Sequence, residues 1–195
     1  MVIIMHQARI VDQREIQRRG GVCAKIPTAC IVASLIDSAG IGRDIVVLDL
    51  TYGEGRFWAA TKPRLLIGAD IRVYNWVVDP DIFIKKPAWA AWRIVANLGV
   101  RVDIVAVDPP WVHHGSDIRR QFGTVLALGT PEIILESALR AANGLGARYM
   151  LVHYKKQWAP KGWEIIDHVR FMPVTRYNNY SKSENTTWFG IMRRQ

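Results

Sequence analysis

The chain has 195 residues, half of them apolar, which suits a single globular domain with a substantial core. A formal net charge of +9 and a pI near 9.9 favour polyanionic partners, nucleic acid first and an anionic membrane surface second. The first apolar run is too short for a secretory signal, and no stretch has the length of a membrane span. We therefore expect a cytoplasmic protein with no membrane attachment.

The two cysteines, Cys23 and Cys30, are expected to be reduced. Their spacing matches neither a zinc pattern nor a disulfide framework, and free thiols are usual inside the cell. Two adjacent histidines, His113 and His114, have no cysteine or carboxylate beside them at ligand spacing. The sequence therefore predicts no metal site.

The chain begins with a mixed, arginine-containing segment, residues 1–24, which we interpret as an N-terminal extension to a domain of residues 25–195. That domain opens with a predicted helix over 25–42. Pro27 suits its first turn, its apolar residues share one face, and two glycines end it.

Strands and helices then alternate. Four runs rich in β-branched residues predict strands buried on both faces, at 44–50, 64–71, 100–107 and 147–154. A fifth strand is placed at 78–84. Helical patterns cover 55–60, 88–98 and the residues from Thr130 onward. This alternation predicts a parallel α/β sheet, and two final runs, 163–174 and 186–194, predict an antiparallel hairpin at its edge.

Ligands in open α/β sheets bind beyond the carboxyl ends of the strands, so the residues that follow each strand are the candidates for a site. The first strand leads into LDLTYGEGRFW, in which Asp49 precedes the glycines Gly53 and Gly55. Such glycines let the backbone approach a ligand closely. A dinucleotide fingerprint needs a third glycine where Trp58 stands, which disfavours a nicotinamide-dependent enzyme. Asp49 can instead bind an ammonium group.

The second strand ends in Asp70, whose two carboxylate oxygens can accept hydrogen bonds from the two hydroxyls of a ribose. Together, Asp49 and Asp70 indicate a ligand with an amino acid head and a nucleoside tail. The segments DLTYGEG and GADI resemble the first two motifs of class I S-adenosylmethionine-dependent methyltransferases.

This resemblance implies a Rossmann-like α/β fold with helices on both faces of a mostly parallel seven-stranded sheet and an antiparallel C-terminal hairpin. It implies S-adenosyl-L-methionine as the cofactor. The cofactor-binding residues that it points to are Lys25, Asp49, Thr51, Tyr52, Gly53, Gly55, Asp70 and Ile71. One of Asn75, Asp79 and Asp81 is a candidate contact for the cofactor's adenine, and the sequence does not choose among them.

The strand at 100–107 is followed by DPPW, Asp108 to Trp111, which resembles the signature of methyltransferases that act on an exocyclic amino group of a nucleobase. Such an amine is a poor nucleophile because its lone pair is spread into the ring. Asp108 and the carbonyl of Pro109 can each accept one N–H and stabilise the developing positive charge. Pro110 stiffens the turn, and Trp111 offers a stacking face.

We therefore expect methylation of N6 of adenine in DNA or RNA. Cytosine N4 and guanine N2 remain as alternative targets, and a non-catalytic RNA-binding subunit that scaffolds a partner remains as an alternative role. The chain lacks room for a separate target-recognition domain, which favours a single-stranded substrate, weak selectivity, or help from a protein partner or a homodimer. Basic and aromatic residues in 112–123, 155–163 and 176–185 are candidate nucleic-acid contacts.

Overall fold

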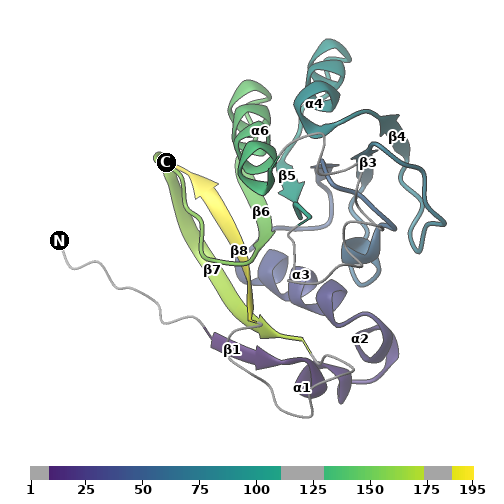
Figure 1. Cartoon of the computed structure of the whole chain (residues 1–195), viewed down its shortest axis with the longest axis vertical. Coiled ribbons are helices and arrows are strands. Elements are labelled where there is room, and N and C mark those ends of the chain that lie inside the picture. The colour runs from purple at the N-terminus through teal and green to yellow at the C-terminus, as the bar shows by residue number, and fades with distance from the viewer. Residues whose placement is uncertain (1–8, 111–129, 174–185) are drawn as a thin grey trace.

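The computed structural model describes residues 9–110, 130–173 and 186–195, and its strands form one eight-stranded sheet (Figure 1). The strands are β1 (Arg9–Asp12), β2 (Val46–Asp49), β3 (Leu65–Asp70), β4 (Ile82–Lys85), β5 (Ile104–Val107), β6 (Tyr149–Tyr154), β7 (Trp163–Met172) and β8 (Thr187–Arg194). They lie in the order β1-β7-β8-β6-β5-β2-β3-β4. Neighbouring strands are parallel except around β8, which runs antiparallel to both β6 and β7.

The architecture expected from the sequence is confirmed. The strand placed at 78–84 corresponds to β4, which begins later, at Ile82, and ends at Lys85. Strands β2 and β5 are buried at every residue, as their unbroken apolar runs require in the centre of a parallel sheet. The sheet has one more strand than the expected seven. The additional strand, β1, comes from the N-terminal segment and pairs in parallel with β7, Arg9 opposite Val169. It has only four residues and only Val11 is buried, so its sequence carries no recognisable strand pattern.

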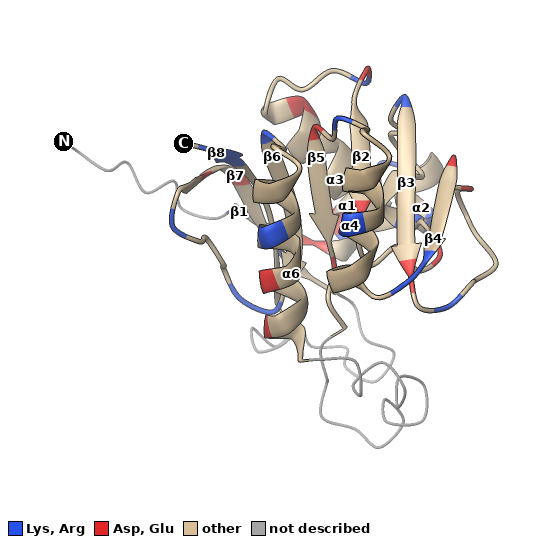
Figure 2. Ribbon diagram, turned by 90° about the horizontal axis from the view of Figure 1, so that it is seen from above, with Lys and Arg blue, Asp and Glu red and all other residues tan. Residues whose placement is uncertain are grey.

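Helices cover both faces of the sheet (Figure 2). One face carries α4 (Ala88–Asn97) and α6 (Pro131–Gly144), which pack on the sheet mainly through alanines. The other face carries α3 (Pro27–Ser38), with α1 (Gln13–Gln17) and the short 3₁₀ turn η1 (Arg56–Trp58) beside it. Each face of the sheet therefore has its own apolar layer. The helices pack on these faces, so a ligand site can form at the ends of the strands.

The expectation of two reduced cysteines is wrong, because Cys23 and Cys30 form a disulfide. In one continuous helix, residues seven apart would lie about 10 Å apart along the axis. Here α2 (Gly21–Lys25) ends before Ile26, whose backbone leaves the helical conformation, and α3 begins at Pro27 as a separate helix. The turn brings the two Cα atoms to 5.6 Å, within the range for a disulfide. The argument for a reducing compartment therefore loses its basis.

Candidate active site

The strand order changes direction between β2 and β5, and this is where an open α/β sheet forms a crevice at its carboxyl edge. From β2 the chain proceeds to β3 on one side, whereas from β5 it proceeds to β6 on the other. Asp49 ends β2 and Asp108 follows β5, so both lie at this crevice. Two adjoining cavities of about 160 and 380 Å³ open there, and both are lined by Thr51, Gly53, Tyr74 and Asp108.

The smaller cavity has mostly apolar walls and two acidic groups, Asp70 and Asp108. Its remaining lining comes from the ends of β2 and β3, the β4–α4 turn, the Asp-Pro-Pro turn and the start of α6: Leu50, Asp70, Ile71, Lys86, Pro87, Ala88, Trp89, Pro110, Ile133, Ile134 and Ser137. Trp89 and Ile133 are each 48% exposed at its rim. Apolar walls with a few placed polar groups are typical of small-molecule sites.

Sequence reasoning missed the contribution of residues 86–89 because the end of β4 was uncertain. Once β4 ends at Lys85, the rule about carboxyl strand ends points to them directly.

The larger cavity is polar and acidic. It is lined also by Thr28, Asp49, Tyr52, Glu54, Arg56, Phe57 and His153. The carboxylates of Asp49, Asp70 and Asp108, from three strand ends, therefore lie along the two adjoining cavities. Their charges act on one another, since Asp108 and Asp70 both raise the pKa of Asp49. A protein with net charge +9 thus carries a locally acidic cleft, which suits a cationic ligand.

Asp49 is almost fully buried, with 3% of its surface exposed. Its carboxylate accepts hydrogen bonds from Nε1 of Trp58 at 2.9 Å and from the backbone N–H of Thr51 at 3.1 Å. Burial raises the pKa of Asp49 to about 7, and the two hydrogen bonds oppose that rise. Trp58 therefore occupies the place of the third fingerprint glycine as a buried ring that orients the acidic group. The helix expected at 55–60 is only the single 3₁₀ turn η1.

Asp70 holds the glycine loop. Its Oδ2 accepts the N–H of Gly53 at 3.0 Å, and its Oδ1 accepts the N–H of Arg72 at 3.1 Å. Burial raises the pKa of Asp70. Gly53 has φ +53°, a left-handed conformation that favours glycine. Among the described residues, a Cβ built there would meet no atom nearer than a backbone oxygen at 3.9 Å. The backbone of Gly53 thus borders open cavity.

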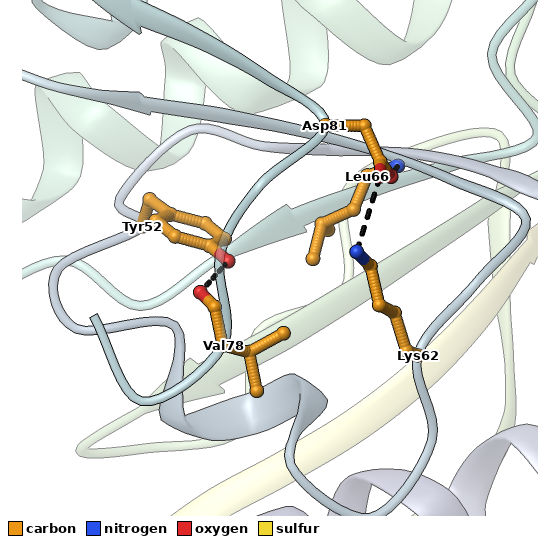
Figure 3. A network of polar contacts seen from close by, with 5 residues as sticks. All are labelled: Tyr52, Lys62, Leu66, Val78 and Asp81. Atoms are coloured by element: carbon orange, nitrogen blue, oxygen red, sulfur yellow. Dashed lines mark hydrogen bonds and ion pairs between the residues drawn. The ribbon is translucent and has the colours of Figure 1, made fainter.

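A hydrogen-bond network holds this loop against the segment before β4 (Figure 3). The hydroxyl of Tyr52 donates to the carbonyl of Val78 at 2.6 Å, and burial raises the pKa of this tyrosine. Asp81 accepts from the N–H of Leu66 at 2.8 Å and from Nζ of Lys62 at 3.1 Å. Asp81, one of the three candidate adenine contacts, therefore ties strands together, and it is not part of the lining of either cavity.

The Asp-Pro-Pro turn is tied to the glycine loop through Thr51. The hydroxyl oxygen of Thr51 accepts the N–H of Asp108 at 2.6 Å. Pro109 is buried, and Pro110 faces the smaller cavity. Trp111 lies outside the described residues, as do the segments 112–123 and 176–185 that were proposed as nucleic-acid contacts.

Lys25 is exposed at the end of α2 and is not part of the lining of either cavity, whereas Thr28 is.

His153 is a site residue to which the sequence analysis assigned no role. It lies on β6, buried beside the Asp-Pro-Pro turn, with Nδ1 3.1 Å from Oδ1 of Asp108. The signal that could have found it is a polar residue near the carboxyl end of an otherwise apolar strand. Because β5 and β6 pair in register, Val107 opposite Val152, the next residues along the two strands are neighbours.

Among the residues that the structure describes, no group of three or more His, Cys, Asp or Glu side chains could hold a metal ion. Within the same ranges, no helix combines the length and the apolar character needed to cross a membrane.

Neither a protein-family model nor a curated protein sequence matches the chain. Solved structures do resemble it. Magnesium protoporphyrin IX methyltransferase from Synechocystis PCC 6803, with bound SAM, aligns at a TM-score of 0.50 and 15% identity over 99% of this chain and 88% of its own. The putative methyltransferase yhhF from Escherichia coli aligns at 0.50 and 12% identity, over 85% of this chain and 84% of its own. A SAM-dependent methyltransferase from Agrobacterium tumefaciens also scores 0.50, at 12% identity, over 87% of this chain and 63% of its own.

These similarities show the fold. The chain has the Rossmann-like fold of class I SAM-dependent methyltransferases, as the motifs around Asp49 and Asp70 indicated. A fold of this kind hosts many activities, so the target has to be argued from the site.

Proposed function

We propose that this chain is an S-adenosylmethionine-dependent methyltransferase that modifies an exocyclic amino group of a nucleobase, most simply N6 of adenine. The observation that carries the proposal is the convergence of three carboxylates on one cleft. Asp49, Asp70 and Asp108 follow three different strands and line two adjoining cavities on either side of the glycine loop. Three carboxylates together favour a cationic ligand that also carries hydroxyl or amino donors.

The described residues fit the cofactor. Asp49 offers a carboxylate for an ammonium group, and the oxygens of Asp70 retain lone pairs for ribose hydroxyls beside an apolar cavity for a nucleobase. Gly53 leaves room for close approach of a ligand to the backbone. When bound, S-adenosylmethionine would supply a methyl group on a sulfonium sulfur. Its positive charges complement the acidic cleft, and a structural neighbour with bound SAM supports this choice.

The Asp-Pro-Pro turn supplies the target side of the proposal. Asp108 lines both cavities, so its carboxylate can reach a group placed between them. A carboxylate oxygen and the Pro109 carbonyl accept the two N–H groups of an aromatic amine, which holds the nitrogen in position and stabilises the charge that develops on it. The proton that the amine gives up on methylation can pass to the Asp108 carboxylate.

A nucleic-acid substrate is proposed from the charge of the chain. The net charge of +9 contrasts with the acidic cleft, so the excess positive charge lies elsewhere and is available for phosphates. Residues 25–195 would form the catalytic domain, and the preceding segment adds the edge strand β1 to its sheet. We propose single-stranded DNA or RNA as the polymer, because its bases are already accessible, with a protein partner or a second copy of the chain as a source of target selectivity.

The test is to incubate the purified protein with methyl-labelled S-adenosylmethionine and, separately, total RNA and DNA free of methyladenine, followed by nucleoside mass spectrometry. N6-methyladenine is the expected product, and Asp108→Asn is the matched control that should abolish it while retaining cofactor affinity. N4-methylcytosine or N2-methylguanine would correct the base. Cofactor binding without any methylated nucleoside would refute the proposed reaction for the chain alone.

A further inference from the structure

We propose that His153 is a positioning residue for the Asp108 carboxylate. The inference rests on the proposed function, since it concerns the group that would hold the target amine. Nδ1 of His153 is buried and lies 3.1 Å from Oδ1 of Asp108, while the Asp108 side chain retains 34% exposure toward the cleft. The histidine thus contacts one carboxylate oxygen of a side chain that still borders both cavities.

The imidazole ring is itself fixed from three sides. Its Nε2 lies 2.9 Å from the hydroxyl oxygen of Thr187 on β8. Its face stacks on Phe189, with ring centroids 3.7 Å apart and planes inclined by 11°, and Phe57 packs against it at 6.0 Å. A ring locked by packing and by a hydrogen bond can hold a neighbouring group to the tolerance that catalysis requires.

The groups around His153 favour a specific role, which is to orient a carboxylate. Asp49, Glu54, Arg56 and Asp108 are the charged groups that line the same cavity. A carboxylate can only accept hydrogen bonds, so a contact between Nδ1 and Oδ1 of Asp108 requires the hydrogen on Nδ1. Nε2 is then able to accept from the hydroxyl of Thr187. The contact therefore calls for a hydrogen on Nδ1, which can be measured without substrate.

Loss of the His153 ring nitrogens should therefore slow methyl transfer while cofactor binding is preserved. His153→Phe keeps the stacking on Phe189 and removes both ring nitrogens, so Asp108 can rotate away from the target amine. We expect kcat to fall about 10- to 100-fold, with the Kd for S-adenosylhomocysteine within about twofold of wild type. His153→Asn retains an N–H donor near the position of Nδ1 and should recover part of the loss.

The matched control is His168→Phe. His168 is equally buried, at 8% exposure, and lies on β7, outside the lining of either cavity. The same change of side chain at an equally buried position, beside Trp188 in the apolar layer of the other sheet face, should leave kcat close to wild type, even if both variants lose stability to a similar extent. A loss of kcat in His168→Phe equal to that in His153→Phe would show a general folding effect and overturn the positioning role.

The first measurement is ¹⁵N NMR of the histidine rings in the wild-type protein and in Asp108→Asn. The proposal expects hydrogen on Nδ1 of His153 in the wild type and a shift of that signal in the variant. A ring with hydrogen only on Nε2, or one indifferent to Asp108→Asn, overturns the pairing whatever the substrate.

In the transfer assay, wild-type kcat in His153→Phe overturns the positioning role and leaves the proposed function intact. A wild-type protein that methylates no nucleobase overturns the proposed function, and the positioning role for an amine falls with it.

Discussion

The buried carboxyl group of Asp49 should make cofactor binding depend on pH near neutrality. Burial raises its pKa from 3.8 to about 7. If the ammonium group of the cofactor binds only the ionised form, the observed Kd equals the intrinsic Kd multiplied by 1 + 10^(pKa − pH). With the pKa at about 7, the factor is about 11 at pH 6 and about 1.1 at pH 8. Affinity should therefore weaken about tenfold as the pH falls from 8 to 6. Burial also raises the pKa of Asp70, which acts in the same direction.

The assay is isothermal titration calorimetry with S-adenosylhomocysteine, which carries the same amino acid head and undergoes no transfer. Titrations between pH 6 and 8 at constant ionic strength, in buffers of different ionisation enthalpy, give both the affinity and the protons released on binding. Asp49→Asn should bind more weakly and with a flatter pH profile. Trp58→Phe removes a hydrogen bond that lowers the pKa of Asp49, so the midpoint of its profile should move to higher pH.

Two results would refute this reasoning: a wild-type affinity that does not change between pH 6 and 8, or a tenfold dependence that persists in Asp49→Asn.

The carboxyl group of Asp49 also affects the stability of the fold, and a rise in pH acts on stability in the opposite direction to its effect on affinity. Its pKa is 3.8 when unfolded and about 7 when folded, so the folded state holds an additional proton between those values. The free energy of unfolding should therefore fall as pH rises through this window, by up to about 4 kcal/mol. Asp49→Asn should show a flatter profile in chemical denaturation.

Three further experiments test individual contacts through protein stability. Gly55→Ala places a Cβ 2.6 Å from a buried tyrosine hydroxyl at φ +72°, whereas Gly40→Ala, at φ +66°, meets no described atom within 4 Å. Urea denaturation should show a loss of about 1–2 kcal/mol for Gly40→Ala and about 1–3 kcal/mol more for Gly55→Ala; equal losses would contradict the close approach. Thr51→Val leaves the N–H at the start of the Asp-Pro-Pro turn without its acceptor, so unfolding free energy should drop by about 1–3 kcal/mol. An unchanged denaturation curve would show that this bond is dispensable. Replacing both Cys23 and Cys30 by Ser should cost about 2–3 kcal/mol. Alkylation of two free thiols in the native, unreduced protein would disprove the disulfide.

Periodicity and composition alone determined most of the sheet. Unbroken β-branched runs such as 44–50 and 100–107 can be satisfied only between other strands, so β2 and β5 were predictable as central elements. Asp49, Asp70 and Asp108 were predictable as residues of one cleft because strand ends of a parallel sheet meet at one edge. Local sequence predicts which strands are central because the burial of each residue follows from its own position in the strand.

Contacts between distant segments were decided only by the tertiary structure. The pairing of β1 with β7 and the Cys23–Cys30 disulfide depend on where the chain turns, at positions that carry no periodic signal. Trp58 shows the same limit, since the sequence marks it only as the wrong residue for a dinucleotide loop. The fold makes it a hydrogen-bond donor to a buried carboxylate.

His153 is the clearest case. Its sequence neighbours define only a strand, and its place beside Asp108 follows from the register of β6 on β5, which no residue of either strand encodes alone. Strand identity is local and was determined by the sequence itself. Register and the packing of side chains across strands are collective properties, and they decide which chemical groups meet in the cleft.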